Sequence, residues 1–167
     1  PLCPKSCSAS RVTEIASVHG SSESPDTPRP IYDPVADNWV RDALARGYPL
    51  GFVGSGDSHD GHPGLVQLAA PTGGMAAIFA EERTRDSVLA ALRGRRTYAT
   101  NGPRILLRAA LGRHRMGSIV PVAEGSTLDE SLFVQVAGTG PIARVEIVRS
   151  GAVVDGVDAE GRLEVAF

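Results

Sequence analysis

In the first third of the chain, the order of apolar and polar residues predicts a strand, a helix and a second strand. Residues 11–18 mix apolar and β-branched side chains, as a short strand does. After a Ser- and Pro-rich loop, Asp33 and Pro34 suit the N-cap and first position of a helix, and apolar residues then recur at helical spacing until Gly47. The apolar run 50–53 predicts the next strand, so the order is that of an α/β unit.

The following segment predicts two more strands around a second helix. Residues 75–79 form an apolar run typical of a buried strand, and residues 97–103 indicate a strand that ends in a turn. Between them, Thr84 can cap a helix that Gly94 ends. Arginines stand at the end of this helix, where positive charge interacts favourably with the helix dipole. We interpret them as solvated capping groups. Binding of an anionic substrate is the alternative. The arginines are Arg93, Arg95 and Arg96.

Beyond Pro103 the helical periodicity disappears. Strand-like runs are separated by Gly and Pro turns, and Ser150-Gly151 can close a hairpin. The runs cover residues 105–111, 132–137 and 145–148. We therefore expect two domains: residues 1–103, the carboxyl-terminal portion of a metal-binding α/β domain, and residues 104–167, a small antiparallel β-sandwich-like domain that is truncated.

Composition excludes several classes of function. The chain has 167 residues and a net charge of −2, so no overall field attracts nucleic acid. No apolar stretch is long enough to span a bilayer, and the amino terminus lacks a signal peptide core. The chain opens without Met and stops within the strand-like run 162–167, which suggests a fragment and leaves export and oligomeric state open. Cys3 and Cys7 have no partners for a sulfur-ligated metal; free thiols or a local disulfide are the alternatives.

The candidate chemistry lies in the Gly-rich segment 51–64, directly after a predicted strand. Asp57 and His59 stand at i and i+2, which puts both side chains on one face if the strand continues. His19 comes at the carboxyl end of the first predicted strand, and it is the best candidate for a third metal ligand. A polar turn, with Asp57 as a cap and solvated histidines, is the alternative interpretation.

Other polar side chains near this motif are secondary candidates. Asp60 and His62 would orient a metal ligand or contact the substrate, and for His62 a solvated loop position is the alternative. Glu23 follows His19 by four residues in a loop, which fixes no shared direction. His114 lies in a Gly- and Arg-rich turn, and we expect it to be exposed.

Three blocks in this order, residues 14–23, 51–64 and 84–107, resemble the carboxyl-terminal half of PHP (polymerase and histidinol phosphatase) domain proteins. The subgroup that continues into a β domain is the most similar. The resemblance implies a distorted (β/α)7 barrel that binds divalent metals and hydrolyses phosphoesters. His19 matches its late histidine ligand, and Asp57 with His59 matches its final DxH pair. The opening HxH element has no counterpart in this chain.

The donor types suit Zn²⁺, Mn²⁺ or Fe²⁺, because several imidazoles disfavour Mg²⁺ or Ca²⁺ alone. Such ions lower the pKa of bound water to about 7. The first hypothesis is therefore a metal-dependent hydrolase, or part of one, in which metal-activated water attacks the phosphorus of a small-molecule phosphoester without any other catalytic side chain. A noncatalytic domain that binds metal or phosphate is the second. The third is a structural or carbohydrate-binding β module, whose metal content would not depend on Asp57 and His59.

Overall fold

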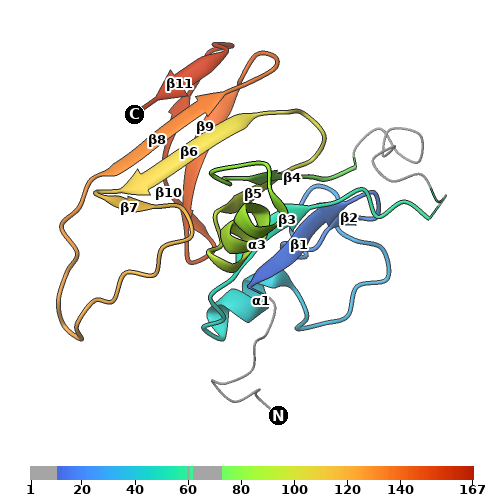
Figure 1. The fold of residues 1–167 in the computed structure, drawn as a ribbon, viewed down its shortest axis with the longest axis horizontal. Coiled ribbons are helices and arrows are strands. Elements are labelled where there is room, and N and C mark those ends of the chain that lie inside the picture. The colour runs from blue at the N-terminus through green and yellow to red at the C-terminus, as the bar shows by residue number, and fades with distance from the viewer. Residues whose placement is uncertain (1–10, 60, 62–72) are drawn as a thin grey trace.

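The computed structural model describes residues 11–59, 61 and 73–167. Its amino-terminal half contains both described helices, and its carboxyl-terminal half consists of strands (Figure 1). The first half comprises β1 (Val12–Ser17), β2 (Gly20–Ser21), α1 (Val40–Ala45), β3 (Gly51–Gly54), β4 (Met75–Ile78), α3 (Arg85–Arg93) and β5 (Thr97–Thr100). The second half comprises β6 (Leu106–Leu111), β7 (His114–Arg115), β8 (Leu132–Ala137), β9 (Arg144–Arg149), β10 (Ala152–Asp158) and β11 (Glu164–Ala166).

Strands β1 and β3 are parallel neighbours in a sheet of order β2-β1-β3, and α1 lies in the connection between them. A parallel pair needs a long crossover of this kind, because a tight turn can join only antiparallel strands. The register pairs Val12 with Gly51. The carboxyl ends of both strands therefore lie at the same edge of the sheet, which is where the candidate site forms.

Helix α1 begins later than the sequence predicts and ends where predicted. Asp33 has φ 53°, outside helical geometry, and Val35 is 68% exposed, so the apolar spacing that begins there is not helical. The backbone N–H of Trp39 instead donates to Asp42 Oδ2 at 3.0 Å, which closes the first turn. At the other end Gly47 has φ 81°, and N–H groups of the following turn return to the last carbonyls, as in a Schellman motif.

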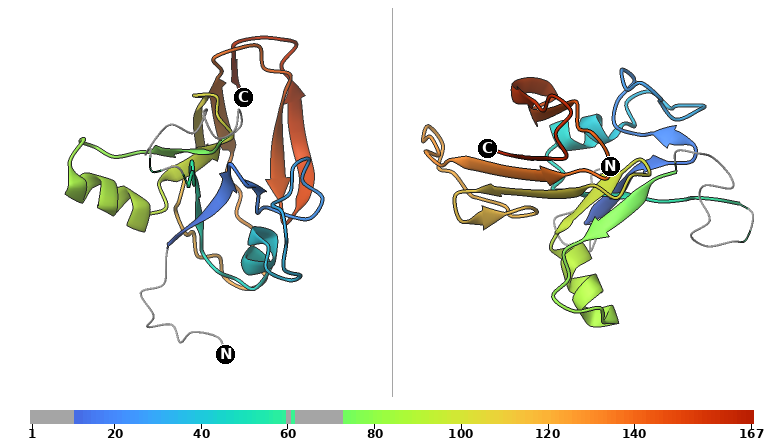
Figure 2. Two further views of the ribbon diagram at one scale, coloured as in Figure 1. Left: turned by 90° about the vertical axis from the view of Figure 1, so that its right-hand side faces the viewer. Right: turned by 90° about the horizontal axis from the view of Figure 1, so that it is seen from above.

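Helix α3 confirms the predicted cap at Thr84, whose Oγ1 accepts a hydrogen bond from the backbone N–H of Ser87 at 3.3 Å. Gly94 is the C-cap, but its φ is −81°; the left-handed position one residue later is occupied by Arg95, with φ 57°. Figure 2 shows α3 on the outside of the molecule, on the side away from the β9–β10 hairpin.

The second half is antiparallel, as the spacing of its strands predicts. Strands β11-β8-β6-β7 form one sheet, and β9 and β10 form a hairpin through the predicted Ser150-Gly151 turn, where both residues have positive φ. The side chains of Val134, Val136 and Val165 are buried between these strands. Leu132, which shares their face by alternation, is 41% exposed at the end of β8.

The expectation of part of a distorted (β/α)7 barrel is wrong. In the described ranges the strands form four small sheets, in which β1 and β3 are the one parallel pair, and two helices are present. Strands β4 and β5 flank α3 but pair antiparallel. A strand-helix-strand pattern therefore did not determine strand direction here. Neither of the helices in the described part is long and apolar enough to cross a membrane.

Candidate metal centre

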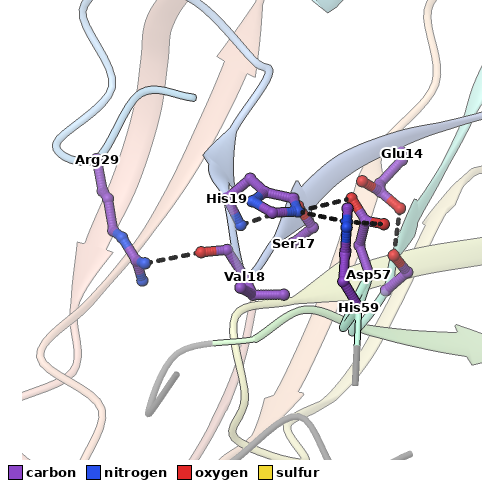
Figure 3. Close-up of polar contacts among 8 residues, drawn as sticks. Glu14, Ser17, Val18, His19, Arg29, Asp57 and His59 are labelled. Carbon is purple, nitrogen blue, oxygen red and sulfur yellow. Dashed lines mark hydrogen bonds and ion pairs between the residues drawn. The ribbon is translucent and has the colours of Figure 1, made fainter. Parts of the chain in front are cut away.

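Three predicted ligand side chains, His19, Asp57 and His59, converge at one point (Figure 3). His19 Nε2 lies 3.3 Å from Asp57 Oδ2, and His59 Nε2 lies 3.5 Å from Asp57 Oδ1. The two Nε2 atoms are 3.2 Å apart. One donor atom from each residue can be chosen so that all three lie within 4.8 Å of one another.

His19 is positioned by the turn that follows β1. Ser17 pairs with Gly20 across the β1–β2 hairpin, so Val18 and His19 form its two-residue turn. The backbone N–H of His19 donates to the hydroxyl of Ser17 at 3.2 Å, and Ser17 is buried. Gly20 has φ 122°, and a Cβ there would lie 2.6 Å from the carbonyl oxygen of Pro30. The turn is thus held from both sides, and it presents the imidazole at the sheet edge.

Asp57 and His59 reach the same edge from β3, but not by strand alternation. The strand ends at Gly54, three residues before Asp57. Asp57 has φ 44°, a left-handed conformation that an aspartate adopts more readily than most residues. This sharp turn, and not a shared strand face, directs the carboxylate back toward His19. Asp57 and His59 therefore lie close together, as predicted, but the left-handed turn at Asp57 and not strand alternation explains it.

The cluster is open to solvent on one side. The exposed fraction of the side chain is 20% for His19, 45% for Asp57 and 74% for His59. Tyr32 packs edge-on against the His19 ring, with centroids 5.2 Å apart, and covers part of it. His19 is therefore the most buried member of the cluster, and the His59 side is open to solvent.

The contact between the two imidazoles restricts their protonation. Two Nε2 atoms 3.2 Å apart cannot both carry a proton directed along the line between them. Either one ring donates to the other, or both direct lone pairs toward a shared cation. Ligand atoms of a tetrahedral metal with bonds of about 2.0 Å are about 3.3 Å apart. The separation of the two Nε2 atoms, 3.2 Å, and that of His19 Nε2 from Asp57 Oδ2, 3.3 Å, are close to that value, whereas the 3.5 Å contact of His59 is to the other carboxylate oxygen, Oδ1.

The secondary candidates fall into two groups. Asp60 and His62 lie outside the described residues, as do Cys3 and Cys7. Glu23 is exposed and is absent from the cluster; its backbone N–H donates to Ser21 Oγ at 3.2 Å. His114 lies on β7 in the second half, is partly buried and is likewise absent from the cluster.

Glu14 and Ser55 were missed by the sequence interpretation. Glu14 lies on β1 (Figure 3), Ser55 directly follows β3, and the Ser55 hydroxyl donates to Glu14 Oε2. This bond ties the start of the metal-site loop to the neighbouring strand. Alternation along β1 places Glu14 and Ala16 on one face, but only the parallel register with β3 reveals the partner.

Comparison with known proteins finds similarity over parts of other sequences. The family DUF3604, described as a protein of unknown function, matches residues 65–116. An uncharacterized protein of Chlamydia pneumoniae is 32% identical over 157 residues, which is 86% of this chain and 25% of that protein. Uncharacterized proteins of Chlamydia muridarum and Chlamydia trachomatis serovar D are also 32% identical, over 84% of this chain in each case and over 25% and 24% of their own lengths. The chain therefore spans about a quarter of the length of these curated relatives. No solved structure matches it.

The interpretation of this chain as a PHP protein is wrong, since the matched family is DUF3604 and the relatives are described as uncharacterized. The motif that suggested it is short. A histidine at one strand end and a DxH pair after another specify donor atoms, and the same donor set recurs on unrelated folds.

Proposed function

We propose that His19, Asp57 and His59 bind one divalent transition metal ion. The observation that supports this most directly is the meeting of two imidazoles and a carboxylate from segments 40 positions apart, with one donor atom of each residue within 4.8 Å of the others and the two Nε2 atoms at a separation near that of tetrahedral ligands. Two nitrogens and one oxygen suit Zn²⁺, Mn²⁺ or Fe²⁺. Three protein ligands with an open side are typical of catalytic zinc sites, whereas structural sites use four.

We further propose that the site hydrolyses small-molecule phosphoesters. A divalent ion held by one carboxylate and two neutral imidazoles leaves a local net charge of about +1, which attracts an anionic ester. When bound, the ion supplies Lewis acidity and lowers the pKa of water toward about 7. His19 and Asp57 would hold the ion at the sheet edge, and the exposed His59 would complete the ligand set on the solvent side.

The decisive experiment measures metal content first and turnover second. The purified chain is stripped with a chelator, reloaded with Zn²⁺ or Mn²⁺, and titrated by calorimetry together with the Asp57→Asn and His114→Ala variants. We expect one ion per chain in the parent and in His114→Ala, and loss of high-affinity binding in Asp57→Asn. Equal metal uptake by all three proteins would overturn the proposed site.

Hydrolysis is then assayed with p-nitrophenyl phosphate and bis-p-nitrophenyl phosphate, with and without the ion. Metal-dependent release of p-nitrophenol that is lost in Asp57→Asn supports the hydrolase. Stoichiometric metal without turnover, in this chain and in a relative of full length, instead supports the noncatalytic metal-binding alternative. The two proposals therefore fail separately.

A further inference from the structure

A second polar site lies at a different place in the fold. A groove of about 520 Å³ runs between the segment around Phe79 and one face of the second-half sheet. We call it the basic groove, because its lining residues include three arginines but only one acidic side chain. The residues used below are Phe79, Glu81, Arg96, Arg108, Arg115 and Phe133.

The sheet brings two of these arginines and a phenylalanine to one face. Ala110 on β6 pairs with Phe133 on β8 and with Arg115 on β7, so these side chains form one cross-strand row. Arg108, two residues before Ala110, projects on the same face. Arg108, Arg115 and Phe133 are all exposed there.

Arg96 completes the groove from the opposite wall. It follows the last turn of α3, and its carbonyl accepts the backbone N–H of Phe79 at 2.9 Å. Its Nε atom is buried and has no hydrogen-bond partner among the described residues. A buried guanidinium N–H without an acceptor is costly, so Arg96 has unused hydrogen-bonding capacity beside the groove.

The arginines of the basic groove outnumber its acidic side chains. Within the described ranges, none of the three arginines forms an ion pair. The lining residues include one carboxylate, that of Glu81, so the three arginines leave an excess of two positive charges in the groove. The residues outside the described ranges contribute a single acidic side chain, Asp60, which adjoins the metal ligand His59 in sequence.

The groove and the metal centre lie at opposite ends of β3. A Cβ at Gly51, where the strand begins, would lie 2.9 Å from the Cβ of Arg95, next to Arg96. The strand then runs to Gly54 and onward to Asp57. One small ligand therefore cannot bridge the two sites.

We propose that the basic groove binds the phosphoryl group of an organic anion, with the apolar part of that ligand packed between Phe79 and Phe133. Two uncompensated charges match a phosphate dianion, and guanidinium groups bind its oxygens through paired N–H donors. The exposed ring of Phe133 and the half-buried ring of Phe79 add an apolar contact that an inorganic ion cannot use.

The test uses phenylphosphonate, which phosphoesterases cannot hydrolyse, with the full chain kept free of metal by a chelator. Inorganic phosphate, phenylacetate and phenol serve as comparison ligands in the same calorimetric titration. We expect phenylphosphonate to bind more tightly than inorganic phosphate or phenylacetate, phenol not to bind, and added salt to weaken binding. Tighter binding of phenylacetate would overturn the phosphoryl assignment.

Variants then locate the binding. Arg108→Gln and Arg115→Gln should each weaken phenylphosphonate binding about tenfold or more, since a charge-assisted hydrogen bond is lost. Arg113→Gln is the matched control, because this exposed arginine lies in the adjacent β6–β7 turn and does not line the groove. Phe133→Ala should remove the advantage over inorganic phosphate. Binding that is absent, or equal in Arg108→Gln, Arg115→Gln and Arg113→Gln, would overturn the proposal whatever the metal titrations show.

Discussion

His19 and His59 are 40 positions apart in the chain, and their Nε2 atoms lie 3.2 Å from each other. The contact depends on the parallel pairing of β1 and β3, which brings the ends of both strands to one edge. Loss of either imidazole should leave the sheet intact but remove a ligand, because both side chains follow their strands and neither lies within one.

We therefore expect His19→Ala and His59→Ala to weaken Zn²⁺ binding about 100-fold or more, since even residues that support a metal ligand contribute about 10- to 100-fold. Competition with a chromophoric chelator measures the affinity. His114→Ala should bind like the parent, because His114 lies on β7 away from the cluster. If the three variants bind Zn²⁺ equally, the contact between His19 and His59 is a simple hydrogen bond.

Glu14 should affect the metal centre through Ser55. The Ser55 hydroxyl donates to the Glu14 carboxylate, so the loop that carries Asp57 is tied to β1. We expect Ser55→Ala and Glu14→Gln to weaken Zn²⁺ binding by about tenfold while the stoichiometry stays at one, as for other groups that orient ligands. Glu23→Gln, in an exposed loop position outside the cluster, is the control. A change in stoichiometry would mean that Glu14 is itself a ligand.

Gly20 should be required for the position of His19. An alanine there would combine an unfavourable φ of 122° with a Cβ placed 2.6 Å from the carbonyl oxygen of Pro30. We expect Gly20→Ala to destabilise the fold by about 1–3 kcal/mol and to weaken metal binding as well. Urea denaturation and the chelator assay measure the two effects. Gly140→Ala has open space around its new methyl group and no positive φ, and it should change neither.

Local features of the fold were predictable from the sequence, whereas only some of the non-local ones were. Thr84 and Gly47 act as helix caps because capping depends on a few neighbouring residues, and both positions are confirmed. The start at Asp33 failed because a Pro-rich loop with scattered apolar residues imitates helical spacing. The barrel failed because the direction in which β4 and β5 pair depends on contacts that no local pattern specifies.

The candidate site was predictable as a set of residues but not as a geometry. The types and positions of His19, Asp57 and His59 were sufficient to expect that they meet, since each follows a strand of a strand-helix-strand unit. The left-handed backbone at Asp57 was not expected, because strand alternation also explains the spacing of a DxH pair.

The basic groove was missed for a different reason. Arg96 lies between α3 and β5, whereas Arg108 is on β6 and Arg115 on β7, and only the β6–β7 register and the end of α3 bring them together.

Tyr98 connects the two halves of the molecule through its hydroxyl. The group donates to the carbonyl of Ile105 at 2.7 Å and accepts the backbone N–H of Leu107 at 3.2 Å, while the side chain is 8% exposed. Tyr98→Phe would leave two backbone groups of the entry into β6 without this partner. Because a buried unpaired group costs about 1–3 kcal/mol, we expect the free energy of unfolding to fall by about that amount. Urea denaturation measures it, and Tyr48→Phe, at a 38% exposed ring, is the matched control. An unchanged unfolding midpoint in Tyr98→Phe would mean that water replaces the hydroxyl at this junction.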